Sequence, residues 1–309
     1  MDKATKIIVI ASVLIIIALA IFVFRGGEEE ETRQPDKVKV ERPKGRRPLG
    51  NADNSGQMQE YVASTEESRQ AMQSIAKAFL SGDEDRIADA IIEMESLGTE
   101  DMLALFDDAM RIKNPDYRRD VLTRLQALPH RGAVAALARA VNDSDPSVRQ
   151  AAISALAMTE GILANEAENA KQADKGRLTL EDEDREQVAG AIRQAVNDSD
   201  PEVRKEIMDS LPLFSGDFQN YGINTAIEAN DREVRSDALF LIQGSYNKET
   251  ITAAMTAIGD KDKQISEQAT DFLHHILGQE FSSAKEALEW WNQNSYKYDY
   301  DLVEQQEED

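Results

Sequence analysis

The chain of 309 residues contains no cysteine and has three histidines. The absence of cysteine excludes a disulfide-bonded scaffold, a thiol enzyme and a cysteine-ligated zinc or iron–sulfur centre. The motifs of phosphate-binding loops, dinucleotide folds, hydrolases and HExxH metalloproteases are also missing. The sequence therefore predicts a non-enzyme without a metal site or cofactor, and no small-molecule substrate is evident.

Positive charge is also scarce. Lys and Arg number 35 against 58 Asp and Glu, which gives a formal net charge of −23. A phosphate backbone attracts a surplus of Lys and Arg, so this balance argues against nucleic acid and favours protein partners enriched in basic residues. The surplus lies in residues 58–309, with 25 basic and 50 acidic side chains, whereas residues 1–57 carry 10 and 8.

One long apolar run stands apart from this polar composition. Residues 7–24 contain no charge, and Ser12 is the only polar side chain among them. A helix rises about 1.5 Å per residue, so this run approaches the hydrocarbon thickness of about 30 Å. A cleaved signal peptide fits less well, because its apolar core usually has about 7–15 residues. We expect residues 1–6 to be a short tail and residues 7–24 an uncleaved, single-pass signal-anchor helix.

Residues 25–57 have the composition of a tether. Pro35, Pro43 and Pro48 interrupt any periodicity, and too few apolar side chains are present to offset the entropy of ordering. Residues 33–47 hold seven basic and two acidic side chains, which suit either a plain spacer or contact with anionic lipid or the acidic body. Because Lys3 and Lys6 precede the apolar run, we expect an inner-membrane protein with its body in the periplasm.

From residue 58 onward the sequence is helical in pattern and repeats itself. Residues 140–149 and 195–204 nearly coincide, and alignment gives five units separated by 31, 55, 31 and 31 positions. The aligned residues are Arg118, Arg149, Arg204, Arg235 and Ser266. Apolar side chains at offsets −1, +3 and +7 from these positions fall on one helical face. A period in the thirties with two helices per unit predicts an α-solenoid.

At these residues the chain resembles the HEAT-repeat (armadillo-like α-solenoid) family, including membrane-anchored bacterial HEAT-repeat proteins. The resemblance rests on an acidic turn, a proline, Val-Arg, a small residue and a leucine. It implies an all-α superhelix of helical hairpins over residues 58–280. It also implies a structural ladder formed by Asp143, Arg149, Asp198, Arg204, Asp231 and Arg235. Each arginine could reach the acidic turn of its own unit or of the next, and a substrate-binding arginine row is the alternative.

Two regions depart from the repeat. Residues 161–184 account for the one long separation, and we expect an insertion that is either a partner-binding loop, a tolerated loop or a longer helical hairpin. Residues 281–309 combine aromatic side chains with an acidic tail. Their aromatic residues either seal the last repeat as a cap or contact a partner, and the candidates for contact are Trp290, Trp291, Tyr296 and Tyr298.

Together these features predict a membrane-anchored, non-catalytic scaffold that presents an acidic solenoid to protein partners. Two alternatives remain open. The chain could be an enzyme of the chromophore-lyase type, which shares helical-repeat folds and would need a pocket of convergent titratable groups. It could also be a purely structural spacer.

Overall fold

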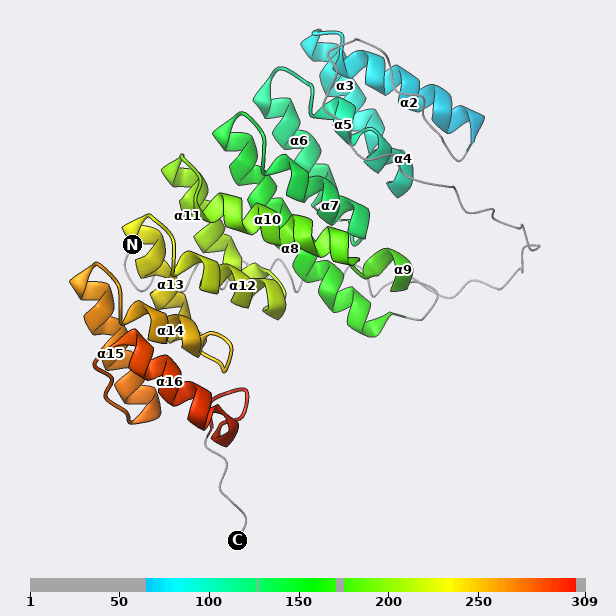
Figure 1. The fold of residues 1–309 in the computed structure, drawn as a ribbon. Coiled ribbons are helices and arrows are strands. Elements are labelled where there is room, and N and C mark those ends of the chain that lie inside the picture. Colours follow the sequence, from blue (N-terminus) through cyan, green and yellow to red (C-terminus); the bar gives the residue numbers. More distant parts are fainter. Residues whose placement is uncertain (1–64, 127, 171–174, 304–309) are drawn as a thin grey trace, which may run out of the picture. The chain divides into compact units, whose positions relative to one another are not determined.

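The computed structural model describes residues 65–126, 128–170 and 175–303, which are helical and contain no β-strand (Figure 1). The predicted tail (1–6), membrane helix (7–24) and tether (25–57) lie outside the described residues. Within the described part, no helix is both long enough and apolar enough to cross a bilayer.

Successive helical pairs stack in chain order from α2 to α16 (Figure 1). The first helices of the pairs form what we name the A layer: α2 (Glu66–Phe79), α4 (Thr99–Ala104) with α5 (Phe106–Ala109), α7 (Arg131–Ala140), α10 (Asp182–Val196), α12 (Gly216–Ala226) and α14 (Ile251–Ala257). The second helices form the B layer: α3 (Glu84–Met94), α6 (Pro115–Leu125), α8 (Pro146–Asn169), α11 (Pro201–Ser210), α13 (Arg232–Gly244) and α15 (Lys263–Leu277). Helix α8 packs against its own partner α7 and against α6 and α11 of its layer. The described body is thus an α-solenoid.

The B-layer helices begin at the repeated acidic turns. Asp145 caps α8 by accepting a hydrogen bond from the Ser147 N–H at 2.9 Å, and Asp200 caps α11 in the same way through Glu202. A proline follows each of these caps at the first helical position, where its missing N–H has no intrahelical partner to lose. The sequence Asp-Pro therefore starts a helix in both units.

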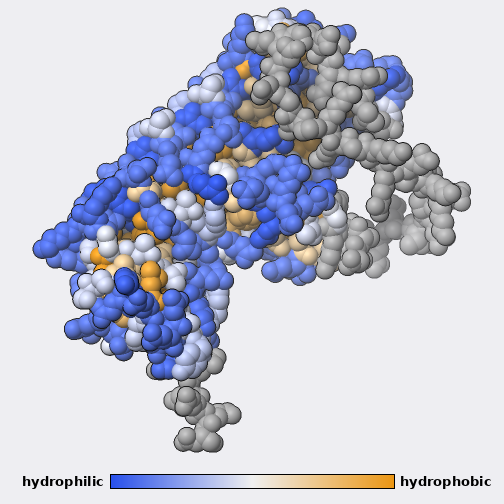
Figure 2. Space-filling view, viewed as in Figure 1, coloured by the Kyte–Doolittle hydropathy of each residue, from blue (hydrophilic) through white to orange (hydrophobic). Residues whose placement is uncertain are grey.

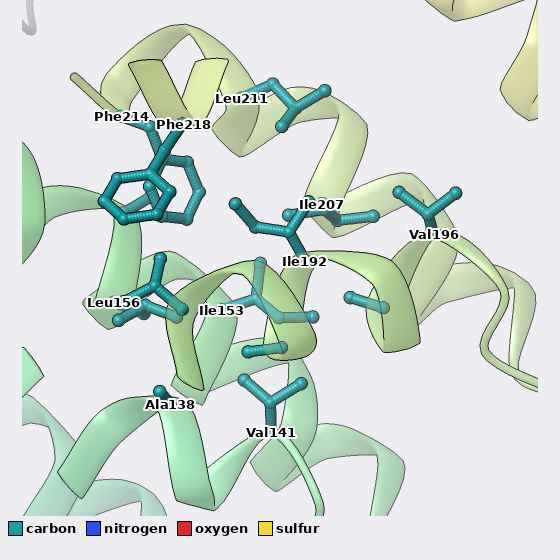
Figure 3. Packing of buried hydrophobic residues seen from close by; sticks show 14 of the residues in the cluster. Ala138, Val141, Ile153, Leu156, Ile192, Val196, Ile207, Leu211, Phe214 and Phe218 are labelled. Atoms are coloured by element: carbon teal, nitrogen blue, oxygen red, sulfur yellow. The ribbon is translucent and has the colours of Figure 1, made fainter. Parts of the chain in front are cut away.

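The repeated apolar positions form the core between the layers. Every aligned residue at offsets −1, +3 and +7 is buried except Tyr117, which is half-buried. Figure 3 shows Leu156 of α8 and Ile207 of α11 among Ile192 of α10 and Phe218 of α12. Burial of one such side chain stabilises the fold by about 1.5–3 kcal/mol. Each unit can bury its stripe only against its neighbours, which makes the stack continuous.

Where the structure describes it, the region around residues 161–184 is mostly helical, apart from residues 170 and 179–181. Helix α8 continues to Asn169, and Leu163 within it is 1% exposed. The short helix α9 (Lys175–Leu178) packs against α7 and α8 and buries Leu178. Leu163 thus belongs to the core, whereas Ile162 beside it is exposed, and the rest of α8 extends the helical pair.

A glycine permits the close approach of the next unit to this long helix. A Cβ atom at Gly161 would lie 2.3 Å from the carbonyl oxygen of Leu213, in the 3-10 helix η1 (Leu211–Leu213) that follows α11. Real Cβ atoms do not approach an oxygen so closely, so any side chain here would displace η1 from α8.

The C-terminal segment folds back on the last unit. Helix α16 (Ala284–Asn294) packs against α14, and the 3-10 helix η2 (Ser295–Lys297) follows it. The Lys248 N–H then donates to the Tyr300 carbonyl oxygen at 2.8 Å. Leu302 adopts a left-handed backbone with φ of 62° and buries its side chain.

Candidate functional site

The repeated arginines and aspartates form bonds from one unit to the next. Arg149 donates from Nε and Nη2 to the two carboxylate oxygens of Asp198 in the following turn, at 2.8 and 2.7 Å. Its Nη1 donates to the carbonyl oxygens of Asp143 and Ser144, in its own turn. The sequence left open whether the arginine contacts the turn of its own unit or that of the next. It contacts both, through the carbonyl oxygens of its own turn and the carboxylate of the next one.

The same arrangement recurs at both ends of the ladder. Arg118 forms two hydrogen bonds with Asp143, at 2.9 and 2.8 Å, and Arg235 forms two with Asp260, at 2.6 and 3.1 Å. Arg118 and Asp260 were missing from the residues predicted for the ladder. The signal was present, because Asp260 lies six positions before the aligned Ser266, as Asp143 lies six before Arg149.

One rung is weaker than the others. Arg204 reaches Asp231 through a single hydrogen bond of 3.0 Å, and their side chains are 19% and 31% exposed. The turn is no shorter than the others, but the position six before Arg235 is Ala229 rather than an aspartate. Asp231 is the N-cap of α13 and accepts hydrogen bonds from the backbone N–H groups of Glu233 and Val234. It contacts Arg204 from this N-cap position, not from the position that the other ladder aspartates occupy.

The carboxylates of Asp198 and Asp260 are held in the charged form. Burial alone would raise the pKa of Asp198, but the Arg149 guanidinium and the Asp200 N–H outweigh burial and hold the pKa below its ordinary value. Burial and the bonds from Arg235 and the Asp262 N–H act on Asp260 in the same way, and its pKa is also lowered. The guanidinium groups donate their hydrogen bonds to carboxylate and carbonyl oxygens within the chain. This arrangement fits a structural ladder better than an anion-binding site.

Arrangements suited to catalysis are sparse. Among the described residues, no group of three or more His, Asp or Glu side chains could hold a metal ion. His130 caps α7 by accepting from the Gly132 N–H at 3.0 Å, and its other nitrogen lies 3.0 Å from a Glu100 oxygen. A hollow of about 410 Å³ lies beside it, against Gly98 and Pro129. The imidazole at this hollow already has partners on both nitrogens.

Glu160 is a buried acid with a structural task. Its side chain is 2% exposed and accepts hydrogen bonds from the Ser215 N–H and hydroxyl, each at 2.8 Å. Burial raises the pKa of Glu160, and the two bonds from Ser215 only partly oppose this. The contact ties α8 to the turn before α12.

The C-terminal aromatic residues divide by exposure. Trp291 and Tyr298 are buried, with ring centroids 5.5 Å apart, and Trp290 lies 5.6 Å from the Phe281 ring. These residues form the cap of the last repeat. Of the four residues predicted for partner contact, only Tyr296 is mostly exposed to solvent, with 68% of its surface accessible.

One face of the body is mainly hydrophilic. Figure 2 shows polar residues over most of the visible surface of the described helices, while apolar and weakly polar residues gather over the C-terminal helices around α14. The A layer also carries paired side chains on its surface, with the Arg185 guanidinium 5.2 Å from the Phe218 ring centroid and the same arginine 2.8 Å from Asp217.

Comparison with known proteins bears on the repeat. A family profile described as HEAT repeats matches residues 103–173. No curated protein matches the chain.

Three solved structures overlay on the chain at low similarity. Escherichia coli YibA is 15% identical with a TM-score of 0.36, covering 77% of this chain and 82% of that chain. An engineered protein is 15% identical with a TM-score of 0.33, covering 68% and 97%. The TOG domain of human Cep104 is 14% identical with a TM-score of 0.35, covering 73% and 88%. The family match thus identifies HEAT repeats in residues 103–173, and the Asp–Arg ladder continues beyond them as far as Asp260.

Proposed function

We propose that this protein is a membrane-anchored, non-catalytic scaffold that binds protein partners through its HEAT-repeat body. The ladder is the observation that supports this best. Arg118, Arg149 and Arg235 are committed to carboxylates and carbonyls inside the body. These bonds hold the repeats in a continuous stack, whose outer helices form an extended surface. Repeat proteins bind partners through surfaces of this kind.

The site of action is part of the same proposal. The uncharged residues 7–24 would anchor the chain in the inner membrane, and Lys3 and Lys6 before them favour a body in the periplasm. The acidic surplus of residues 58–309 favours partners rich in Lys and Arg.

The alternatives make different demands on the body. A chromophore-lyase type of enzyme needs a pocket in which several titratable groups converge. At the hollow beside His130 the imidazole caps a helix, and at a second hollow Arg185 is paired with Asp217. A structural spacer needs only length, so any solenoid of equal length would replace it.

Affinity capture from native membranes tests the proposal. We expect the full-length chain to recover a reproducible set of proteins at low salt and less of them at high salt, because exposed charges are screened. A chain lacking residues 1–24 should recover the same set from solubilised membranes. If nothing co-purifies at low salt, the scaffold proposal fails. If an unrelated solenoid of equal length restores the phenotype of a deletion strain, the spacer alternative is correct.

A further inference from the structure

The B-layer surface of α11, α13 and α15 carries an exposed aromatic side chain between carboxylates. Phe240 on α13 is 69% exposed and lies five positions after the ladder arginine. The same position is Asp209 on α11 and Asp271 on α15. Helix α13 packs against both of these helices, and the ladder bonds set them in register. In this register, Phe240 occupies on α13 the position that aspartates occupy on the two neighbouring helices of the layer.

Further carboxylates surround this position. We name as the Phe240 surface the exposed or half-buried residues Glu206, Asp209, Asp237, Phe240, Glu267 and Asp271. Burial raises the pKa of Asp237, and the negative charges of Asp209 and Glu233 raise it further. The carboxylates thus repel one another, and a cationic ligand would relieve that repulsion.

The arginines of α11 and α13 and the lysines of α11 and α15 already bind carboxylates of this chain. Arg204 and Arg235 turn to the ladder. Lys205 is bound to Asp209 at 2.7 Å, and Lys263 lies 3.1 Å from Glu267. Both lysine pairs are exposed, so their bonds exchange readily with other cations.

A pair of aromatic rings lies on α15 and just after the end of α13. The Tyr246 ring, 38% exposed after the end of α13, meets the half-buried Phe272 ring of α15 edge to face at 5.7 Å. A single exposed phenylalanine is ordinary on a protein surface. Here it shares a helix layer with exposed carboxylates, two of which are paired with lysines, and an apolar centre with a polar border is the composition of an interface core and rim.

We propose that the Phe240 surface docks a basic segment of a partner protein, with an apolar side chain on Phe240 and Lys or Arg on the flanking carboxylates. This proposal rests on the scaffold function and names the surface that performs it. Neighbouring helices lie about 8–10 Å apart. A segment in the polyproline II conformation advances about 3.1 Å per residue and turns once in three residues, so basic residues three positions before and after the apolar one lie about 9 Å from it on the same face.

A peptide of that pattern tests the surface directly. The probe is a fluorescein-labelled nonapeptide with a central Trp and Lys three positions on either side in a Ser/Gly background, and its partner peptide has Glu in place of Lys. Binding to the full-length chain in detergent is measured by fluorescence anisotropy. We expect the Lys peptide to bind, the Glu peptide not to bind, and added salt to weaken binding.

Variants then locate the binding site. Phe240→Ser is expected to weaken binding about tenfold, as loss of an aromatic anchor does. Asp209→Asn with Asp271→Asn should weaken it as well. Ile92→Ser is the matched control, because Ile92 is 61% exposed on helix α3 of the same layer. Glu166→Gln with Glu168→Gln is the charge control, on exposed positions of α8.

The absence of cysteine gives a second readout. A photo-crosslinker on Gln243→Cys, on α13, would be attached to the only thiol, and Gln293→Cys on α16 is the control position. We expect the Lys peptide to crosslink to position 243 and not to position 293. Crosslinking of equal yield at both positions would overturn the proposal, as would equal affinity of wild type and Phe240→Ser.

Failure of this proposal is distinguishable from failure of the scaffold function. If Phe240→Ser recovers the same proteins from membranes in the same amounts as wild type, partners bind elsewhere and the scaffold function stands. If wild type recovers none, the scaffold function itself fails. Urea denaturation of Phe240→Ser should match wild type, since an exposed side chain contributes little to stability, and this excludes misfolding as the cause of lost binding.

Discussion

Arg235 and Asp260 join two consecutive repeats through two hydrogen bonds, at 2.6 and 3.1 Å, with side chains only 5% and 4% exposed. Arg235 also donates to the carbonyl oxygens of Ala229 and Asn230. The Arg235 side chain thus donates hydrogen bonds both to carbonyl oxygens of its own turn and to the carboxylate of the next unit. The repeats are therefore held by polar bonds as well as by their apolar stripes.

Removal of Arg235 should destabilise the body strongly. Arg235→Ala leaves the buried Asp260 carboxylate without its cation, and loss of one partner of a buried pair costs about 3–5 kcal/mol. Arg204→Ala should cost less, because its rung has one carboxylate bond and is more exposed. Urea denaturation followed by circular dichroism gives the order, with the exposed Lys285→Ala as control. An equal loss for Arg204→Ala and Arg235→Ala would contradict the geometry.

The ladder should make the body sensitive to acid. The pKa values of Asp198 and Asp260 are lowered from an ordinary 3.8 by their arginines and backbone N–H donors, against burial. Their contribution to stability is therefore complete above the unfolded-state pKa and is lost as the pH falls below it. We expect the free energy of unfolding to drop between pH 4 and pH 2, and less steeply in Asp260→Asn. An unchanged slope in that variant would separate the acid sensitivity from the ladder.

Glu160 should act in the opposite direction. Burial raises its pKa from an ordinary 4.5, so its contribution is fully present below the unfolded-state pKa and is lost as the pH rises through the folded-state pKa. Glu160→Gln keeps an oxygen for the Ser215 N–H and removes the titrating proton. The variant should be as stable as wild type or more stable at pH 7, and it should lose this pH dependence. A larger destabilisation at pH 7 than at pH 4 would show that the buried charge is required.

Two glycines make a matched pair. Gly161→Ala places a Cβ atom against the Leu213 carbonyl oxygen and should cost about 1–3 kcal/mol through displacement of η1. Gly190→Ala in α10 meets nothing within 4 Å and should stabilise the helix by about 0.5–1 kcal/mol. Thermal melts of the two variants are expected to move in opposite directions. If Gly161→Ala is also stabilising, η1 does not approach α8 as described.

The aromatic cap should respond to one tryptophan and not to a nearby tyrosine. Trp291→Ala removes a buried ring from the contact with Tyr298, and such substitutions cost about 3–5 kcal/mol. Tyr296→Ala changes an exposed ring and should cost little. Amide hydrogen exchange should rise in α14 and α16 for the first variant alone. Unaltered protection of α16 in Trp291→Ala would mean that the cap is held by other contacts.

Local signals account for much of what was predicted. Asp145-Pro146 and Asp200-Pro201 start helices because cap and proline act within one turn. The apolar stripe identified the core because its members recur with the helical period. Alignment of the repeats also located Arg118, but not its bond to Asp143. The two residues are 25 positions apart and lie in different units, so no local sequence signal marks their contact.

The sequence by itself determined that this protein is a stack of helical pairs, since caps, prolines and periodicity depend on neighbours along the chain. Only the tertiary structure decided that Arg149 bonds to the carboxylate of the next unit, that Trp291 is buried in a cap, and that Phe240 is exposed on α13. These outcomes depend on how one unit is placed on the next. That placement follows from packing over many residues, and no single segment encodes it.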